Sequence, residues 1–227
     1  GLGKTLGNFC ARTAFRGSDL SLPTKEKKKD TALFQGNVEL MAITENLIFT
    51  EPYFEAEMNH HTEGLEPVIN TLRSDVSLKQ EVQHMLVKFT SNTETLLHGD
   101  LHSGSVMCTD KETKIIDPEF GFYGPMGFDI GMLISNFLMA YFSQPGHRTE
   151  NTLEKYQNWI LSIIEEIYST FISEFSNLWR NERHGILFPK SLFESQGHSS
   201  EDALNGVINR IWSDALGICG IEMHRRI

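Results

Sequence analysis

The chain has 227 residues, a formal net charge of -10 and a pI near 5.4. Apolar residues make up 40% of it, which is enough for a hydrophobic core and excludes a disordered or fibrous chain. Asp and Glu number 30 against 20 Lys and Arg, whereas nucleic-acid binders usually carry a basic surplus, so no nucleic-acid partner is expected. A site for a negatively charged nucleotide would therefore need Mg²⁺ or a local basic cluster.

Three cysteines are widely spaced and form no CxxC pair: Cys10, Cys108 and Cys219. This usage predicts reduced thiols and a cytoplasmic location rather than a disulfide framework. The longest apolar stretch, residues 130–142, is shorter than the roughly 20 residues of a membrane-spanning helix, so no membrane contact is expected. The chain starts at Gly1 and its first methionine is Met41, so we expect a piece of a longer protein.

The first half of the chain alternates between helical and less regular patterns. Residues 1–15 have apolar side chains on one helical face, which predicts a helix. Residues 16–30 are polar and contain a run of lysines, which predicts a solvated loop. Residues 38–54 alternate loosely and predict short strands or extended chain. Residues 65–90 again show helical spacing, with a break expected near Ser77.

The second half begins with short β-favouring runs and then becomes helical. The β-favouring runs are residues 95–97, 105–108 and 113–116. The helical spacing covers residues 128–142, 152–179 and 202–218. We therefore expect an α+β fold that is rich in helix, with a small β hairpin that carries the polar motifs.

The first polar motif is His98-Gly99-Asp100-Leu101-His102, which lies between two of the β-favouring runs. Asp100 should therefore occupy a short loop, where its carboxylate can face a ligand. Ser105 follows in the same loop and can offer a second oxygen to a metal ion. A single Asp in a loop is more often a turn former than a catalyst. The interpretation as a site therefore depends on the motif that follows.

The second motif is Asp117-Pro118-Glu119, after the last β-favouring run. Pro118 should keep Asp117 extended, so that the two carboxylates project from the same side of the segment. Such a pair of hard oxygen donors suits Mg²⁺. One acid in a loop and a metal-binding pair on the next hairpin is the division of labour in phosphoryl transfer. In that arrangement Asp100 would orient the proton of the attacking hydroxyl.

The two motifs together resemble a known family. The block from His98 to Gly131, with HGDLHSGS and DPEFGFYGPMGFDIG, resembles the small-molecule kinases of the aminoglycoside phosphotransferase and choline kinase type. It is most similar to the methylthioribose kinases of methionine salvage, which share a late arginine pair, here Arg225-Arg226. Segments 36–40 and 49–53 look like family segments as well. Ser105 stands where most members of the wider family have Asn.

The resemblance implies a protein kinase-like fold. Residues 1–227 would form its helix-rich C-terminal lobe, and the N-terminal nucleotide-binding lobe would be absent from this chain. The implied reaction moves the γ-phosphoryl group of ATP to the 1-hydroxyl of S-methyl-5-thio-D-ribose. The product is S-methyl-5-thio-α-D-ribose 1-phosphate. The resemblance also suggests a homodimer.

The same resemblance assigns roles to single residues. Asp100 would be the catalytic base, and Asp117 and Glu119 would bind Mg²⁺. The contacts to Mg²⁺-ATP would come from Asp117, Pro118, Glu119 and Ser105. Arg225 and Arg226 would lie beside the sugar or the transferring phosphoryl group, where an arginine can stabilise developing negative charge.

Two residues of the block are expected to support the site rather than react. His98 should hydrogen-bond within its own loop. Asp129 can either cap the helix that follows it or brace the catalytic loop through backbone hydrogen bonds, as in related kinases. The glycines of residues 121–127 predict a close backbone approach, either to substrate or to a neighbouring helix.

One part of a kinase is missing from the sequence. No Gly-rich loop, strand lysine or adenine hinge precedes the motifs, so we expect little or no activity from these 227 residues alone. Two alternatives stay open: another sugar, aminoglycoside or choline-type kinase, and a non-catalytic lobe that has lost its nucleotide cradle. Against the latter, Asp100, Asp117 and Glu119 are all present, and three buried acids without a metal would be costly.

Overall fold

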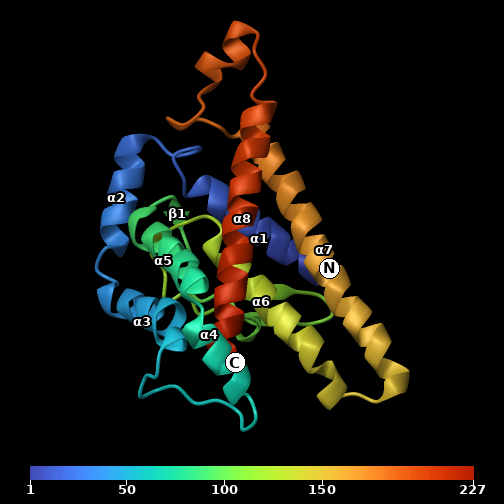
Figure 1. Cartoon of the computed structure of the whole chain (residues 1–227). Coiled ribbons are helices and arrows are strands. Elements are labelled where there is room, and N and C mark those ends of the chain that lie inside the picture. The colour runs from blue at the N-terminus through green and yellow to red at the C-terminus, as the bar shows by residue number, and fades with distance from the viewer.

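The computed structural model describes all 227 residues, and helices dominate it (Figure 1). The α-helices are α1 (Leu2–Arg16), α2 (Thr24–Phe34), α3 (Val38–Phe49), α4 (Glu66–Ser74), α5 (Val76–Ser91), α6 (Phe128–Ser143), α7 (Glu150–Asn181) and α8 (Glu201–Arg226). The strands are β1 (Thr95–Leu96), β2 (Val106–Cys108), β3 (Thr113–Ile115) and β4 (Tyr123–Gly124). None of the helices has the length and apolar character needed to cross a membrane.

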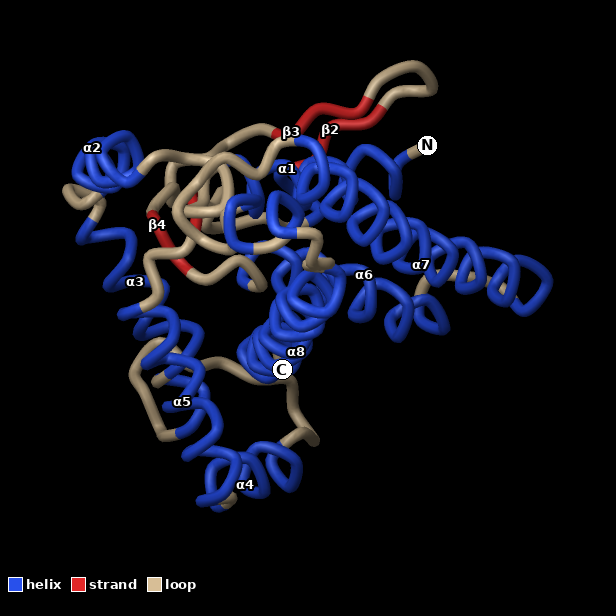
Figure 2. Tube along the Cα trace, turned by 90° about the horizontal axis from the view of Figure 1, so that it is seen from above, coloured by secondary structure: helices blue, strands red, loops and turns tan.

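The strands form two small antiparallel pairs. β2 pairs with β3, and β1 pairs with β4, which the sequence did not predict as a strand. The β2–β3 hairpin extends from the body next to the N-terminal end of α1 (Figure 2). The predicted layout, rich in helix with a small β element, is confirmed. So are the predicted helices that correspond to α1, α6, α7 and α8.

Long helices build the main core. α7 packs along α1, and α6 packs along α8 (Figure 1). Their buried side chains form a cluster of 22 residues, with Phe171 and Trp179 of α7 completely buried. The crossing of α6 and α8 is close because α6 presents glycine there: a Cβ at Gly131 would lie 2.5 Å from the Ala215 carbonyl oxygen. The predicted glycine-rich segment, residues 121–127, approaches the same helix through Gly127, where a Cβ would lie 2.6 Å from the Ile211 carbonyl oxygen.

A second, smaller core of 11 buried residues lies under α3 and α5. Phe89 is at its centre, with ring centroids 4.8 Å from Phe122 and 5.1 Å from Phe128. Phe49 of α3 packs on the same ring at 5.2 Å. Tilted aromatic pairs at these distances add attraction beyond the area they bury. This core fixes α3 beside the segment that follows the Asp117 motif.

The connection between α7 and α8, residues 182–200, projects beyond the helices at the top of Figure 1. Its anchor is Arg183, whose side chain is fully buried and donates to the Glu194 carboxylate at 2.6 Å and to the Ser200 hydroxyl at 3.0 Å. The guanidinium carbon also lies 4.5 Å from the centre of the Trp179 ring, a cation–π contact.

Two predictions about local structure are wrong. Residues 16–30 were expected in a solvated loop, but residues 24–30 form most of α2, in which Lys27 is buried and pairs with Asp19. Residues 38–49 were expected to be extended and form α3. Met41, Thr44 and Ile48 recur at helical spacing on the face of α3 that meets the smaller core.

The break expected near Ser77 occurs earlier, at Asp75. The Asp75 carboxylate accepts a hydrogen bond from the Leu78 N–H at 2.9 Å and so caps the N-terminus of α5. An aspartate in this position satisfies one of the free N–H groups of a first helical turn. The helical spacing predicted both α4 and α5, and the capping residue sets the boundary between them.

Candidate active site

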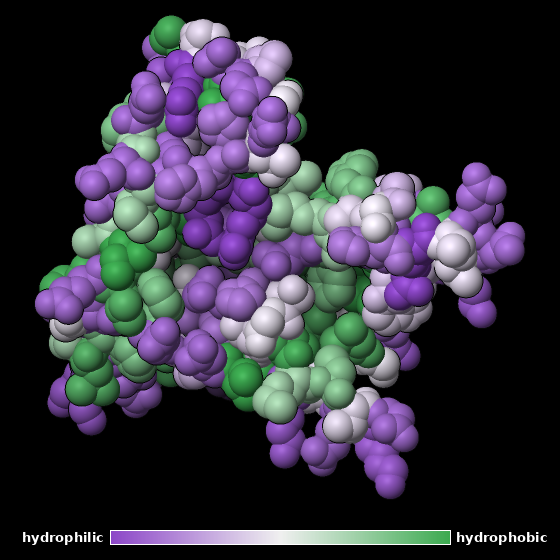
Figure 3. Space-filling model, turned by 90° about the horizontal axis from the view of Figure 1, so that it is seen from below, coloured by the Kyte–Doolittle hydropathy of each residue, from purple (hydrophilic) through white to green (hydrophobic).

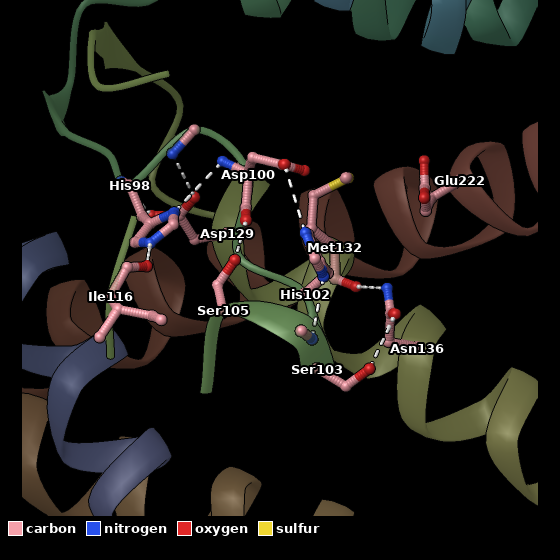
Figure 4. A network of polar contacts seen from close by, with 12 residues as sticks. His98, Asp100, His102, Ser103, Ser105, Ile116, Asp129, Met132, Asn136 and Glu222 are labelled. Atoms are coloured by element: carbon pink, nitrogen blue, oxygen red, sulfur yellow. Dashed lines mark hydrogen bonds and ion pairs between the residues drawn. The ribbon is translucent and has the colours of Figure 1, made fainter. Parts of the chain in front are cut away.

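Asp100 lies in the loop between β1 and β2, and its side chain is about one-third exposed. The loop is held from below by Asp129 in the first turn of α6 (Figure 4). The N–H groups of His98 and Gly99 donate to the two Asp129 carboxylate oxygens at 2.7 Å and 3.0 Å. Asp129 makes no side-chain cap at the start of α6, so it braces the loop instead. Burial raises the pKa of the Asp129 carboxyl, and the two donors oppose that rise.

Gly99 allows the loop to touch the segment after Asp117. Its φ is +84°, a left-handed conformation that favours glycine. A Cβ on Gly99 would lie only 2.0 Å from the Phe120 carbonyl oxygen. A side chain of any kind would therefore push the Asp100 loop and the Phe120 segment apart.

His98 makes a second connection between the two motifs. Its Nδ1 accepts a long hydrogen bond, 3.4 Å, from the Asp100 N–H, so Nε2 carries the proton and donates to the Ile116 carbonyl at 2.8 Å. Ile116 directly precedes Asp117. The buried imidazole thus ties the backbone of Asp100 to the start of the acidic motif (Figure 4).

Ser105 is buried, and its hydroxyl donates to the Asp100 carbonyl at 3.2 Å. This contact closes the loop on itself. Its proposed contact with Mg²⁺-ATP stays a prediction.

The acidic motif differs from its expected geometry. Asp117 has a φ of +66°, so it is left-handed and not extended as predicted. Proline disfavours the right-handed helical region for the residue before it, and Asp is one of the residues that tolerate the left-handed one. The argument that an extended segment places both carboxylates on one side is therefore wrong.

The burial of the three acids was also misjudged. Asp117, Pro118 and Glu119 are exposed, and Asp100 is partly exposed. The cost of burying acids therefore cannot count against a lobe without catalytic function. Exposed carboxylates are open to incoming ligands, as a site for a metal-nucleotide complex requires.

Asn37, between α2 and α3, fixes the segment after the acidic pair. Its side-chain amide donates to the carbonyls of Glu119 at 2.9 Å and Gly121 at 3.0 Å. The sequence pointed to residues 36–40 only as a family-like segment and gave Asn37 no role. Its partners lie more than 80 residues away, so no local pattern could show the contact.

A cavity of about 180 Å³ opens beside Asp100. One side is formed by loop residues and by the end of α8: Gly99, Asp100, Phe120, Arg225 and Arg226. Its other side is formed by α3 residues Ile43, Thr44, Leu47 and Ile48. The arginine pair predicted to face the substrate thus lies in the same cavity as the predicted base, although the two are far apart in sequence. Figure 3 shows hydrophilic side chains gathered at the middle of the face on which α8 ends.

The arginine pair has a buried partner that the sequence reasoning missed. Arg225 donates to the Glu222 carboxylate at 2.7 Å and 3.0 Å, and Arg226 donates to it at 2.8 Å. Glu222 has no exposed surface. The sequence did contain a signal for these contacts. Glu222 precedes Arg225 by three residues and Arg226 by four, and residues with this spacing meet on a helix surface.

His102 is a second missed neighbour of the site. Its Nδ1 accepts from the Gly104 N–H at 2.9 Å, so its Nε2 carries the proton and lies 3.4 Å from the Asp100 carboxylate (Figure 4). The next residue, Ser103, donates to the side chain of Asn136 on α6 at 3.3 Å. The loop after Asp100 is thus tied to α6 as well.

The donor set fits a metal that arrives with a nucleotide. No group of three or more His, Cys, Asp or Glu side chains gathers closely enough to hold a metal by itself. Mg²⁺ usually binds one or two carboxylates and takes its other ligands from phosphate and water. The exposed pair Asp117 and Glu119 offers that kind of partial site.

Comparison with known proteins agrees with this arrangement. Residues 31–159, more than half of the chain, match the phosphotransferase enzyme family. The chain belongs to this family. The matched residues include Asp129, the Asp100 loop and the acidic motif Asp117-Pro118-Glu119, and the match ends in the first part of α7.

Curated relatives within the family are similar over the whole chain. A methylthioribose kinase of Escherichia coli O45:K1 is 43% identical over all of this chain and 54% of its own length. Methylthioribose kinase 1 of Oryza sativa subsp. japonica is 37% identical, with 100% and 53% covered. A methylthioribose kinase of Geobacillus thermodenitrificans is 38% identical, with 99% and 52% covered. The chain thus spans about half the length of the curated relatives it matches.

Proposed function

We propose that residues 1–227 are the helix-rich C-terminal lobe of a methylthioribose kinase. The enzyme would transfer the γ-phosphoryl group of ATP to the 1-hydroxyl of S-methyl-5-thio-D-ribose, a step of methionine salvage. The observation that carries the proposal is the cavity that brings Asp100 together with Arg225 and Arg226. Relatives named methylthioribose kinase, 35–43% identical, supply the substrate.

Asp100 would act as the base. Its partly exposed carboxylate faces the cavity and can accept the proton of the sugar hydroxyl as that oxygen attacks. The loop beneath it is fixed by Asp129, His98 and Ser105 through backbone hydrogen bonds. A base held in this way loses little freedom when substrate binds, which favours a productive geometry.

The arginines of the cavity, and the acidic pair Asp117 and Glu119 outside its lining, would divide the rest of the work. Arg225 and Arg226 supply the local basic cluster that an acidic protein needs to attract a phosphorylated ligand. Asp117 and Glu119 would hold Mg²⁺, with Pro118 and Ser105 nearby as contacts to the nucleotide complex. When bound, Mg²⁺-ATP supplies the phosphoryl group and neutralises part of its charge.

The walls of the cavity favour a neutral, partly apolar sugar. Ile43, Leu47 and Ile48 form an apolar side that suits a methylthio group, and the opposite polar side suits a ribose ring. Aminoglycosides and choline are cations and would meet two arginines at this cavity. Because the carboxylates of Asp100 and Glu222 offset the charges of these arginines, the apolar α3 side of the cavity, rather than charge repulsion, favours methylthioribose over both alternative substrate classes.

The remaining features of the enzyme belong to the same proposal. The three cysteines are unpaired, as expected in the reducing cytoplasm, where we place the protein. The partner expected from the family is a second copy of the chain, in a homodimer. A lobe without a nucleotide cradle should have little activity alone, so the tests below use the full-length protein that contains these residues.

The first test replaces the base. Asp100→Asn should lower kcat for methylthioribose phosphorylation at least about 100-fold, because a positioned general base contributes a factor of this size or more. The matched control is Asp110→Asn, an exposed aspartate in the β2–β3 turn, which should keep activity within about twofold. Rates are measured as methylthioribose-dependent release of ADP.

Three results would contradict all or part of the proposal. Full activity of Asp100→Asn would remove the assigned base. A full-length protein that folds and binds ATP but phosphorylates no sugar would indicate a non-catalytic lobe. Phosphorylation of another alcohol in place of methylthioribose would keep the kinase and correct its substrate.

A further inference from the structure

We propose that Glu222 is a positioning residue, which holds Arg225 and Arg226 toward the Asp100 cavity. The inference deepens the proposed function and rests on it. It assigns to one buried carboxylate the task of setting the direction of both guanidinium groups.

The contacts on Glu222 account for both of its oxygens. Oε2 accepts from Arg225 Nε at 2.7 Å, while Oε1 accepts from Arg225 Nη2 at 3.0 Å and from Arg226 Nε at 2.8 Å. The Glu222 side chain is 0% exposed, whereas the Arg225 and Arg226 side chains are 22% and 43% exposed. The carboxylate is therefore inside the protein and the two guanidinium groups extend from it toward solvent.

Helix geometry explains why such a partner is needed. Neighbouring residues of an α-helix point about 100° apart, so Arg225 and Arg226 do not share a face by default. Glu222 lies three and four residues earlier and projects between the two. A common acceptor at that position draws both side chains toward one cavity, where each of them is found.

The same contact limits the freedom of two long side chains. A free arginine has many rotamers, and ordering it costs roughly 1.5–2 kcal/mol. Because the hydrogen bonds to Glu222 order the arginines before the substrate binds, this entropy cost does not have to be met during the reaction. Charge-assisted, bidentate pairing of the kind seen with Arg225 is among the most directional contacts in proteins.

Two other titratable side chains, Cys219 and His224, lie close to Glu222 on α8. Burial raises the pKa of the Cys219 thiol, one turn earlier, to about 11, and the negative charge of Glu222 adds to that rise. His224 adds no positive charge at neutral pH, because burial lowers its pKa, and its Nδ1 contacts the Tyr53 hydroxyl at 3.0 Å. The cluster of one glutamate and two arginines therefore leaves one net positive charge beside the cavity.

The test compares Glu222→Gln with a matched control in the full-length protein. Glu201→Gln is the control, since Glu201 lies on the same helix and receives a bidentate pair from Arg180 at 2.9 Å and 2.7 Å, far from the cavity. We expect Glu222→Gln to lower kcat about 10-fold or more while the KM for methylthioribose changes less than about threefold. Glu201→Gln should change neither by more than about twofold.

A double-mutant cycle separates positioning from a purely structural role. In a background with Arg225→Lys and Arg226→Lys, the planar guanidinium groups are gone, so Glu222→Gln should lower kcat no further. An equal loss in both backgrounds would show that Glu222 acts through the fold and would overturn the proposal. If Glu222→Gln does not fold, the cycle is run with Glu222→Asp, which keeps the charge and shortens the reach.

A measurement without turnover keeps this inference distinct from the proposed function. The Nε–H groups of Arg225 and Arg226 both donate to Glu222, so their NMR signals should exchange slowly with water in the original protein and quickly in Glu222→Gln. Unchanged exchange would overturn the positioning role even in an active kinase. The original protein could also show slow exchange that is lost in Glu222→Gln, yet have no kinase activity. That result would refute the proposed function but leave the contact between Glu222 and the arginines established.

Discussion

At the residue scale, the segment around Asp117 shows how much of a site depends on single backbone conformations. The backbone of Asp117 is in the left-handed region. So is the backbone of Gly99, which lies against Phe120 in the same segment. Residues held in sparsely populated regions cluster at functional sites, where the surrounding structure must enforce them. Here the enforcing contacts come from His98 and Asn37, which hold the backbone on either side of the acidic pair.

Gly99 gives a test of this enforcement. Gly99→Ala places a Cβ 2.0 Å from the Phe120 carbonyl oxygen in addition to an unfavourable φ. The matched control is Gly197→Ala, at φ +78° with no atom within 4 Å. We expect Gly197→Ala to cost about 1–2 kcal/mol for the backbone conformation alone. Gly99→Ala should cost a further 1–3 kcal/mol, roughly, for the clash.

Denaturant unfolding of both variants gives the comparison. Equal free energies of unfolding for Gly99→Ala and Gly197→Ala would show that the loop and the Phe120 segment can separate freely. The close contact would then contribute nothing to the site.

The sequence could select the candidate residues for chemistry, but it showed only part of what positions them. Asp100 and the acidic pair stand in compact motifs, and the arginines stand side by side, so pattern alone was enough to select them. Asn37 and Asp129 act on backbone groups that are distant in sequence. Asp129 was found only as one of two possible roles, because a sequence does not show which N–H groups lie above a carboxylate.

At the element scale, helical spacing in the sequence predicted α1 and α4 to α8, but it did not predict α2 and α3. α1 and α7 bury continuous stripes, whereas α2 buries only Lys27 among its residues. Its lysines and glutamate are good helix formers, yet the charge run favoured a loop interpretation. α3 combines a buried threonine with exposed apolar residues, so its spacing resembled a strand. Tertiary packing against the smaller core decides the case of α3, whereas the tertiary contact that α2 makes through its buried residue is the Lys27–Asp19 pair.

The crossing of α6 and α8 can be tested with two glycines of opposite environment. Gly131→Ala should destabilise the protein by about 1–3 kcal/mol, because the new methyl group would lie 2.5 Å from the Ala215 carbonyl oxygen and must push the helices apart. Gly206→Ala, in α8 with open space around it, should stabilise by about 0.5–1 kcal/mol through helix propensity. Thermal unfolding distinguishes the two signs, and a gain for both would mean that the crossing adapts without cost.

At the scale of the whole molecule, the connection between α7 and α8 makes stability depend on pH. The Arg183 guanidinium, followed by the Ser200 hydroxyl, lowers the pKa of Glu194 from its usual 4.5 to about 2. A carboxyl with a lowered pKa stabilises the fold above its unfolded value and loses that contribution as the pH falls toward the folded one. Because the Glu194 side chain is 43% exposed, solvent screening reduces the effect.

We therefore expect the melting temperature to fall between pH 4.5 and about 2, and part of that fall to disappear in Glu194→Gln. The comparison is made by thermal unfolding across this range at constant ionic strength. Glu112→Gln, an exposed residue of the β2–β3 turn, is the control and should follow the original profile. Parallel profiles for all three proteins would exclude Glu194 as a source of the pH dependence.

The overall layout could be predicted because it depends on composition and period, which are local properties. The pairing of α1 with α7 and of α6 with α8 could not, since it depends on which glycines and apolar stripes fit one another. The acidic charge of the chain predicted that a phosphate site would need Mg²⁺ or a basic cluster, and an arginine pair lies in the candidate cavity.

The bonds from His98 and Gly99 to Asp129 span 31 and 30 residues of chain. During synthesis, at about 5–20 residues per second, the Asp100 loop therefore leaves the ribosome seconds before Asp129, which braces it, has been made. The arginine pair appears later still, at the end of the last helix. The cavity that holds Asp100, Arg225 and Arg226 is thus complete only after both arginines have been made, so a shorter nascent chain lacks the proposed phosphoryl-transfer site.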